Sequence, residues 1–164
     1  MCIRDSSRSF PLLLPLLDQH FPVERMSVVY ALGRNPCPTA VEKLVSLLET
    51  DDNAYVRRAT AWSLANYDNQ IVLEPLINAL KNDVAAVRLW SSSSLAEIGN
   101  VSSKNAQLAA EQLLISLKID NEPGVRSNCI WSLCRLYEKL NNTFQESFVC
   151  LLYTSPSPRD TIRS

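Results

Sequence analysis

The sequence predicts an all-α protein, an α-solenoid built from about four repeats of two helices each. Three observations indicate this class: pairs of leucines four residues apart recur, a Val-Arg pair recurs, and only 3 of the 164 residues are glycine. Leucines at i and i+4 share one face of a helix. Scarce glycine disfavours a β-rich fold with many tight turns. Because two short helices cannot bury their apolar stripes alone, neighbouring repeats must stack.

The first helix of each repeat carries the leucine pair. Its copies are Leu13 with Leu17, Leu44 with Leu48, Leu76 with Leu80, and Leu113 with Leu117. Pro75 lacks a backbone N–H and is tolerated only in a first turn, so its helix should begin near Leu73 or Glu74. Another helix should begin within residues 144–149.

The second helix of each repeat begins near a Val-Arg pair, and a leucine follows eight residues after the valine. The copies are Val56-Arg57 with Leu64, Val87-Arg88 with Leu95, Val125-Arg126 with Leu133, and a degenerate Glu24-Arg25 with Leu32. The arginines lie 32, 31 and 38 residues apart, and the longest interval includes the polar stretch 100–105. Apolar or small residues at offsets 0, 4, 8 and 11 define one helix face.

Turn-forming residues separate these helices. Acidic loops at 51–53, 82–83 and 120–124 precede the second helices and should cap the exposed amides that follow. Further breaks at 35–38, 66–69 and 99–100 fall where a repeat should end.

Both ends of the chain are predicted not to be native. Residues 1–6 can be back-translated as ATGTGTATAAGAGACAG, and the reverse complement of that string encodes Cys-Leu-Leu-Tyr-Thr, the run found at 150–154. The string resembles an adaptor used in transposase-based sequencing, which 155–160 would continue. We therefore expect residues 1–6 and 150–164 to derive from the adaptor. Residues 7–149 would then be a fragment of a longer repeat protein, with further repeats of the same chain missing at both ends.

A leucine pair, an acidic loop and then Val-Arg with a later leucine resemble the short HEAT-like repeat, an armadillo-like helical unit, especially the variant of phycobilin lyase subunits. Residues 55–64 and 86–95 carry the resemblance best, and it covers residues 12–140. It implies that the repeated arginines bond to the acidic loop of an adjacent repeat. Arg57, Arg88 and Arg126 would then form a structural ladder with Asp51 or Asp52, Asp83 and Asp120. Because helix N-termini favour anions, an anion-binding role for this row is the alternative.

Aromatic residues recur at offset 6 of the second helices, away from the face defined above. Those positions are Tyr30, Trp62, Ser93 and Trp131. The resemblance places this offset on the concave side of the solenoid, where neighbouring residues are also apolar or small. Either close packing of the repeats buries these side chains, or they form a binding groove. Under the second hypothesis, the three aromatic residues flank a shallow pocket over Ser92 and Ser93.

The sequence contains no recognisable catalytic or metal-binding set. His20 is the only histidine, and the His-Glu pairs of the related di-iron deoxyhypusine hydroxylase are absent. Cys37, Cys129 and Cys134 have neither the spacing of a zinc site nor that of a disulfide framework. They are typical of reduced thiols, so we expect a cytoplasmic location.

These observations favour a non-catalytic scaffold that binds a protein partner on its concave face. The alternative, implied by the resemblance, is a subunit or chaperone of a phycobilin lyase, which would hold a linear tetrapyrrole for attachment to an antenna protein. Nucleic-acid binding is disfavoured because the sequence has 16 Lys and Arg residues against 17 Asp and Glu residues, and so no excess of positive charge. The apolar run at 10–17 is too short, and too interrupted by proline, to span a membrane.

Overall fold

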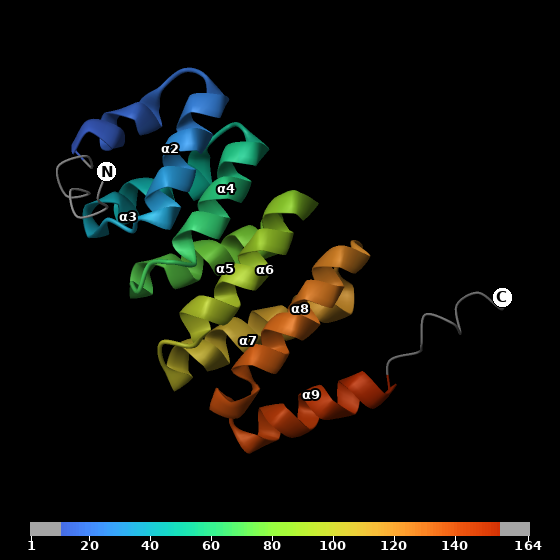
Figure 1. The fold of residues 1–164 in the computed structure, drawn as a ribbon. Coiled ribbons are helices and arrows are strands. Elements are labelled where there is room, and N and C mark those ends of the chain that lie inside the picture. Colours follow the sequence, from blue (N-terminus) through green and yellow to red (C-terminus); the bar gives the residue numbers. More distant parts are fainter. Residues whose placement is uncertain (1–10, 155–164) are drawn as a thin grey trace.

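The computed structural model describes residues 11–154, and every regular element in that range is a helix (Figure 1). The predicted all-α solenoid is therefore confirmed. The α-helices are α2 (Pro22–Arg34), α3 (Val41–Thr50), α4 (Ala54–Leu64), α5 (Leu73–Asn82), α6 (Ala85–Gly99), α7 (Ser103–Ile119), α8 (Pro123–Leu136) and α9 (Asn142–Thr154). Short 3-10 helices are η2 (Leu14–Asp18), η3 (Pro38–Ala40), η4 (Gln70–Val72) and η5 (Tyr137–Lys139).

The helices are arranged in two layers (Figure 1). In one layer α2, α4, α6 and α8, which carry the repeated arginines, pack against one another in chain order. In the other, α3, α5 and α7 carry the leucine pairs, and each packs on the second helix that follows it. Consecutive repeats therefore share one interior, as the stacking argument requires.

The repeated apolar residues build this interior. Leu44, Leu76 and Leu113 of the first helices are fully buried, as are Val56 and Val87 of the second helices. Burial of a valine or leucine side chain contributes roughly 1.5–3 kcal/mol, so the recurring positions supply much of the stability of each repeat.

The segment with Leu13 and Leu17 differs from the expected α-helix. Residues 11–13 form a helical turn, and Leu14–Asp18 continues as the 3-10 helix η2. In a continuous α-helix the N–H of residue 15 would bond to the carbonyl of residue 11. Pro15 has no N–H, so the regular helix ends here.

The longer interval between Arg88 and Arg126 is taken up by helix rather than by loop. Helix α7 has 17 residues where α3 and α5 each have 10. Only the beginning of the polar stretch 100–105 lies outside a helix, and the Ser102 side chain caps α7 by accepting from the Asn105 N–H at 3.1 Å.

The acidic loops do not cap the helices in the way expected. The carboxylates of Asp51, Asp83 and Asp120 accept from amides one or two residues further along the loop, at 2.7–2.9 Å. The only side-chain cap that these loops supply is Asn53, which accepts from the Tyr55 N–H at 2.9 Å. The carboxylates are held away from the helix ends because arginines from neighbouring repeats bind them.

Several predicted boundaries are confirmed. Helix α5 begins at Leu73, with Pro75 in its first turn, and helices end at the expected breaks around residues 35, 66 and 100. Residues 1–6 and 155–164 lie outside the described residues, while α9 crosses the expected boundary between residues 149 and 150. Within residues 11–154, no helix combines the length and apolarity needed to cross a membrane.

Candidate binding face

Three arginines connect successive repeats through paired hydrogen bonds to aspartates. Nε and Nη2 of Arg57 donate to the Asp83 carboxylate at 2.8 and 2.7 Å. The same two atoms of Arg88 donate to Asp120, both at 2.8 Å. Arg25 extends the ladder to the first repeat, donating to Asp51 at 2.7 and 2.8 Å.

The order of the ladder is shifted by one repeat relative to the expected one. Arg57 binds the carboxylate of Asp83, in the following loop, and its Nη1 donates to the carbonyl oxygen of Asp51, in its own loop, at 2.8 Å. A guanidinium can hold two loops because its donors point along two edges of one plane. Arg126 forms only the second kind of contact, with the carbonyls of Asp120 and Asn121 at 2.8 and 3.1 Å.

These contacts lower the pKa of two ladder carboxylates, those of Asp51 and Asp120. Hydrogen bonds from Arg88 hold the pKa of Asp120 below its usual range, against the opposing effect of burial. Burial is the largest influence on Asp51 and favours its neutral form, but the hydrogen bonds from Arg25 and from the backbone lower its pKa overall. Aspartates occupy the guanidinium forks of Arg25, Arg57 and Arg88, which disfavours anion binding by these three arginines.

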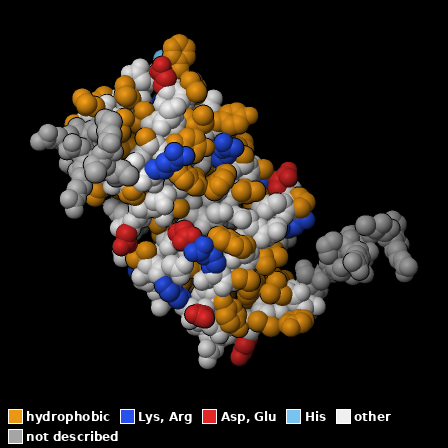
Figure 2. All heavy atoms as spheres, in the orientation of Figure 1, with side chains coloured by type: hydrophobic (Ala, Val, Ile, Leu, Met, Phe, Trp, Pro, Cys, Tyr) orange, Lys and Arg blue, Asp and Glu red, His pale blue; other side chains and the backbone are white. Residues whose placement is uncertain are grey.

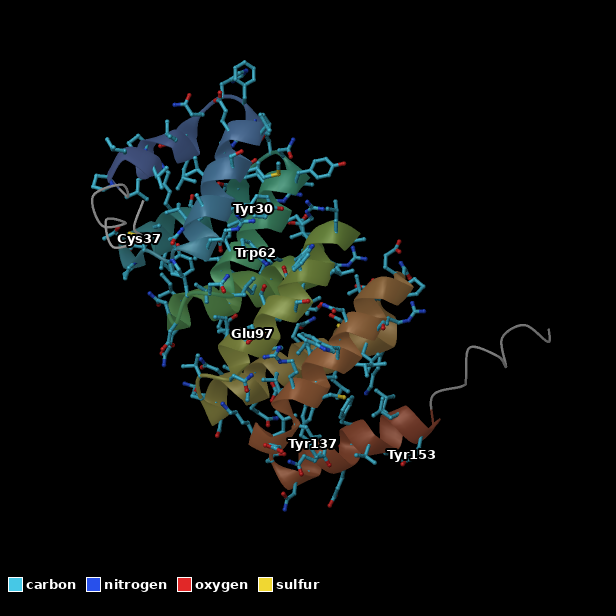
Figure 3. All side chains as sticks on the ribbon, in the orientation of Figure 1. Tyr30, Cys37, Trp62, Glu97, Tyr137 and Tyr153 are labelled. Atoms are coloured by element: carbon cyan, nitrogen blue, oxygen red, sulfur yellow. The ribbon has the colours of Figure 1, made fainter. Side chains whose placement is uncertain are left out.

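The aromatic residues at offset 6 lie along the layer of second helices, and we call its outer side the second-helix face. Tyr30 of α2 and Trp62 of α4 are half-buried and touch, with ring centroids 5.3 Å apart (Figure 3). The Tyr30 hydroxyl also accepts from Nη2 of Arg58 at 3.4 Å. Trp131 of α8 is different, because 47% of its surface is exposed.

A pocket of about 320 Å³ opens on this face at Ser93, the offset-6 residue that lies between Trp62 and Trp131. Its walls are Trp62 of α4 and Trp131 of α8, and the small Ser93 of α6 leaves the space between them. The full lining of this tryptophan pocket consists of Trp62, Ala65, Asn66, Trp90, Ser93, Ser94, Glu97 and Trp131. Figure 2, in the same orientation, shows hydrophobic side chains gathered along this face among a few charged ones.

Ser92 lies beneath this face and does not line the pocket. It is fully buried, and its carbonyl accepts from the Ser132 hydroxyl at 2.8 Å. Its own hydroxyl donates to the Leu89 carbonyl at 2.7 Å and accepts from Asn128 Nδ2 at 2.8 Å. Small hydroxylated side chains let α6 and α8 approach closely, so the serine run contributes to packing on its inner side and to the pocket on its outer side.

Trp90 and Glu97 line the pocket but lie outside the set of site residues predicted from the sequence. Trp90 packs against the core and also lines the pocket. Glu97 (Figure 3) lines the pocket, and Arg135 of the next repeat binds its carboxylate at 2.8 Å. Glu97 and Arg135 both lie at offset 10 of their helices, one turn beyond offset 6. The sequence signal for this pair is the opposite charge of the two residues at offset 10.

A comparison with protein-family models finds one match, described as HEAT repeats, at residues 10–96 and 41–134. The matched ranges cover most of the chain and include both the ladder and the tryptophan pocket. No curated protein matches the chain.

Proposed function

Because the chain belongs to the HEAT-repeat family, we propose that it is a non-catalytic scaffold that binds a protein partner on the second-helix face, the expected concave side. The observation that carries this proposal is the pocket between Trp62 and Trp131, with Trp131 47% exposed. Rigid aromatic anchors beside a pocket are typical of the centres of protein interfaces.

Packing and binding account for different members of the aromatic row. The contact between Tyr30 and Trp62 favours packing for that pair, since each ring buries part of the other. Trp131 is 47% exposed, and the Arg135 guanidinium carbon lies 4.8 Å from its ring centroid. Trp131 shares one pocket with Trp62 and Trp90, and large apolar side chains gathered on a surface favour binding.

The proposal is tested by selecting peptides from a display library on the immobilised protein and on its Trp131→Ala variant. We expect enriched peptides to bind the wild-type protein and to lose about 30-fold or more in affinity on Trp131→Ala, the scale of an interface hot spot. Titration calorimetry measures the affinity, and circular dichroism checks that helical content is unchanged.

A matched control is Ile119→Ala, which removes a side chain that is 72% exposed on α7, in the other layer. Binding of the selected peptides should not change in this variant. Equal enrichment on the wild-type and Trp131→Ala proteins, or an unfolded Trp131→Ala variant, would contradict the proposal.

The alternative, a phycobilin lyase component, is kept because a pocket with three indole rings suits a flat conjugated ligand. Mixing the protein with a linear tetrapyrrole and recording its absorption distinguishes the two. A red-shifted, sharpened band that requires Trp131 would favour the lyase component, and an unchanged spectrum would favour the plain scaffold. The proposal includes a cytoplasmic location, in keeping with the unpaired thiols of Cys37, Cys129 and Cys134.

A further inference from the structure

An arginine of the chain itself already binds at the edge of the tryptophan pocket. The Cζ atom of Arg135 lies 4.8 Å from the ring centroid of Trp131. Its Nη1 and Nη2 pair with Oε1 and Oε2 of Glu97 at 2.8 and 2.9 Å. A planar guanidinium stacked on an indole and forked onto a carboxylate is a favourable arrangement for this group. Trp131 and Glu97 are therefore already positioned to recognise a guanidinium.

The contact between Arg135 and Glu97 is open to exchange. The two side chains are 39% and 41% exposed. In the ladder, by contrast, Arg88 and Asp120 are 19% and 5% exposed. Exposed ion pairs are screened by water and contribute little, so a competing cation can replace Arg135 without a large penalty.

The rest of the pocket also suits a cation. Among the described residues that line it, Glu97 alone is charged. Trp62, Trp90 and Trp131 supply indole rings, whose faces attract positive charge. An acidic group entering the pocket would instead meet the Glu97 carboxylate.

We propose, resting on the function proposed above, that the partner is a protein segment that presents an arginine. That arginine enters between Trp62 and Trp131 and replaces Arg135 in the ion pair with Glu97. Arg135 is thus an internal competitor, which occupies the guanidinium site of the free protein and is released when the partner binds.

The test uses a peptide library with a central arginine and the same library with citrulline in its place, since citrulline keeps the shape but lacks the charge. Binding is followed by fluorescence anisotropy of labelled peptides. We expect arginine peptides to bind the wild-type protein at least about tenfold more tightly than their citrulline counterparts. In Glu97→Gln this preference should largely disappear.

The Arg135→Ala variant gives the sharper result. Removing an internal competitor should strengthen arginine-peptide binding by about two- to fivefold, the range that corresponds to an exposed ion pair. Arg34→Ala is the matched control, because Arg34 is exposed at the equivalent position of α2 and does not line the pocket. It should leave binding unchanged.

Equal binding of arginine and citrulline peptides would overturn this inference without requiring any variant to fold, and so would weaker arginine-peptide binding by Arg135→Ala. If peptides bind in a Trp131-dependent way but show no preference for arginine, the scaffold function stands and only this inference fails. If no peptide depends on Trp131, both fail.

Discussion

Replacement of Arg88 by methionine measures how much one step of the arginine ladder stabilises the solenoid. Arg88 joins two repeats: Nε and Nη2 bind the Asp120 carboxylate, both at 2.8 Å, and Nη1 donates to the carbonyl of Asp83 at 2.8 Å. Methionine keeps the apolar stem of the side chain and removes all three contacts. The variant therefore isolates the polar part of the ladder.

The expected loss follows from the burial of the remaining carboxylate. The Asp120 side chain is 5% exposed, and without Arg88 it keeps the Glu122 amide at 2.9 Å. Removing one partner of a buried ion pair destabilises a protein by about 3–5 kcal/mol. Because Arg88 is itself 19% exposed, water can partly replace it. We therefore expect a decrease of about 2–3 kcal/mol in the free energy of unfolding.

Urea unfolding followed by circular dichroism measures this change, and the melting temperature should fall by roughly 4–12 °C for a chain of this size. Arg126→Met is the matched control, since Arg126 has the same place in its repeat but bonds only to the carbonyls of Asp120 and Asn121. Its loss should be about 1 kcal/mol.

A double-mutant cycle with Asp120→Asn tests whether the effect passes through the ion pair. We expect a coupling free energy of about 1.5 kcal/mol or more between the two substitutions. A loss below about 1 kcal/mol in Arg88→Met, equal losses in Arg88→Met and Arg126→Met, or additive effects in the cycle would refute the assignment of the ladder as a stabilising contact.

Three further outcomes are expected. Hydrogen bonds from Arg88 lower the pKa of Asp120 in the folded state, so on acidification the unfolded state binds protons first. The free energy of unfolding should therefore be highest near neutral pH and should decrease below about pH 4. Acid titration followed by circular dichroism measures this decrease. Gly33→Ala places a Cβ 2.6 Å from Cζ3 of Trp62, so it should lower stability by about 1–3 kcal/mol in urea unfolding and shift tryptophan emission; an unchanged emission spectrum would count against this close contact. Burial raises the pKa of the Cys129 thiol to about 12, so at pH 8 a thiol reagent should modify exposed Cys134 well before Cys129. Mass spectrometry of the digested protein measures the order of modification, and earlier modification of Cys129 would contradict the expectation.

The helices and their buried faces could be predicted from the sequence because both depend on local spacing. Leucines four apart, such as Leu76 and Leu80, can share a helix face whatever the rest of the chain does, and both are buried in α5. The start of α5 near Pro75 followed from the chemistry of a single residue. The difference at Leu13 and Leu17 is also local, because Pro15 lacks the N–H that a continuous α-helix requires there.

The candidate site was predicted only in part. The offset comparison identified Trp62, Ser93 and Trp131, which the structure brings to one pocket. It did not identify Glu97, whose partner Arg135 lies 38 residues away. It also included Ser92, which belongs to the same helix but whose hydroxyl accepts from Asn128 of α8 in the interface between the two helices.

The sequence alone determined that this protein is a stack of two-helix units with arginines in register, because hydrophobic period and repeat length are properties of the chain itself. Only the tertiary structure decided that Arg25, Arg57 and Arg88 each reach the aspartate of the following loop, and that Glu97 of the tryptophan pocket pairs with Arg135. Those contacts depend on how far one packed repeat is rotated and shifted on the next. The sizes of the side chains between the helices set that displacement, and spacing along the chain does not record it.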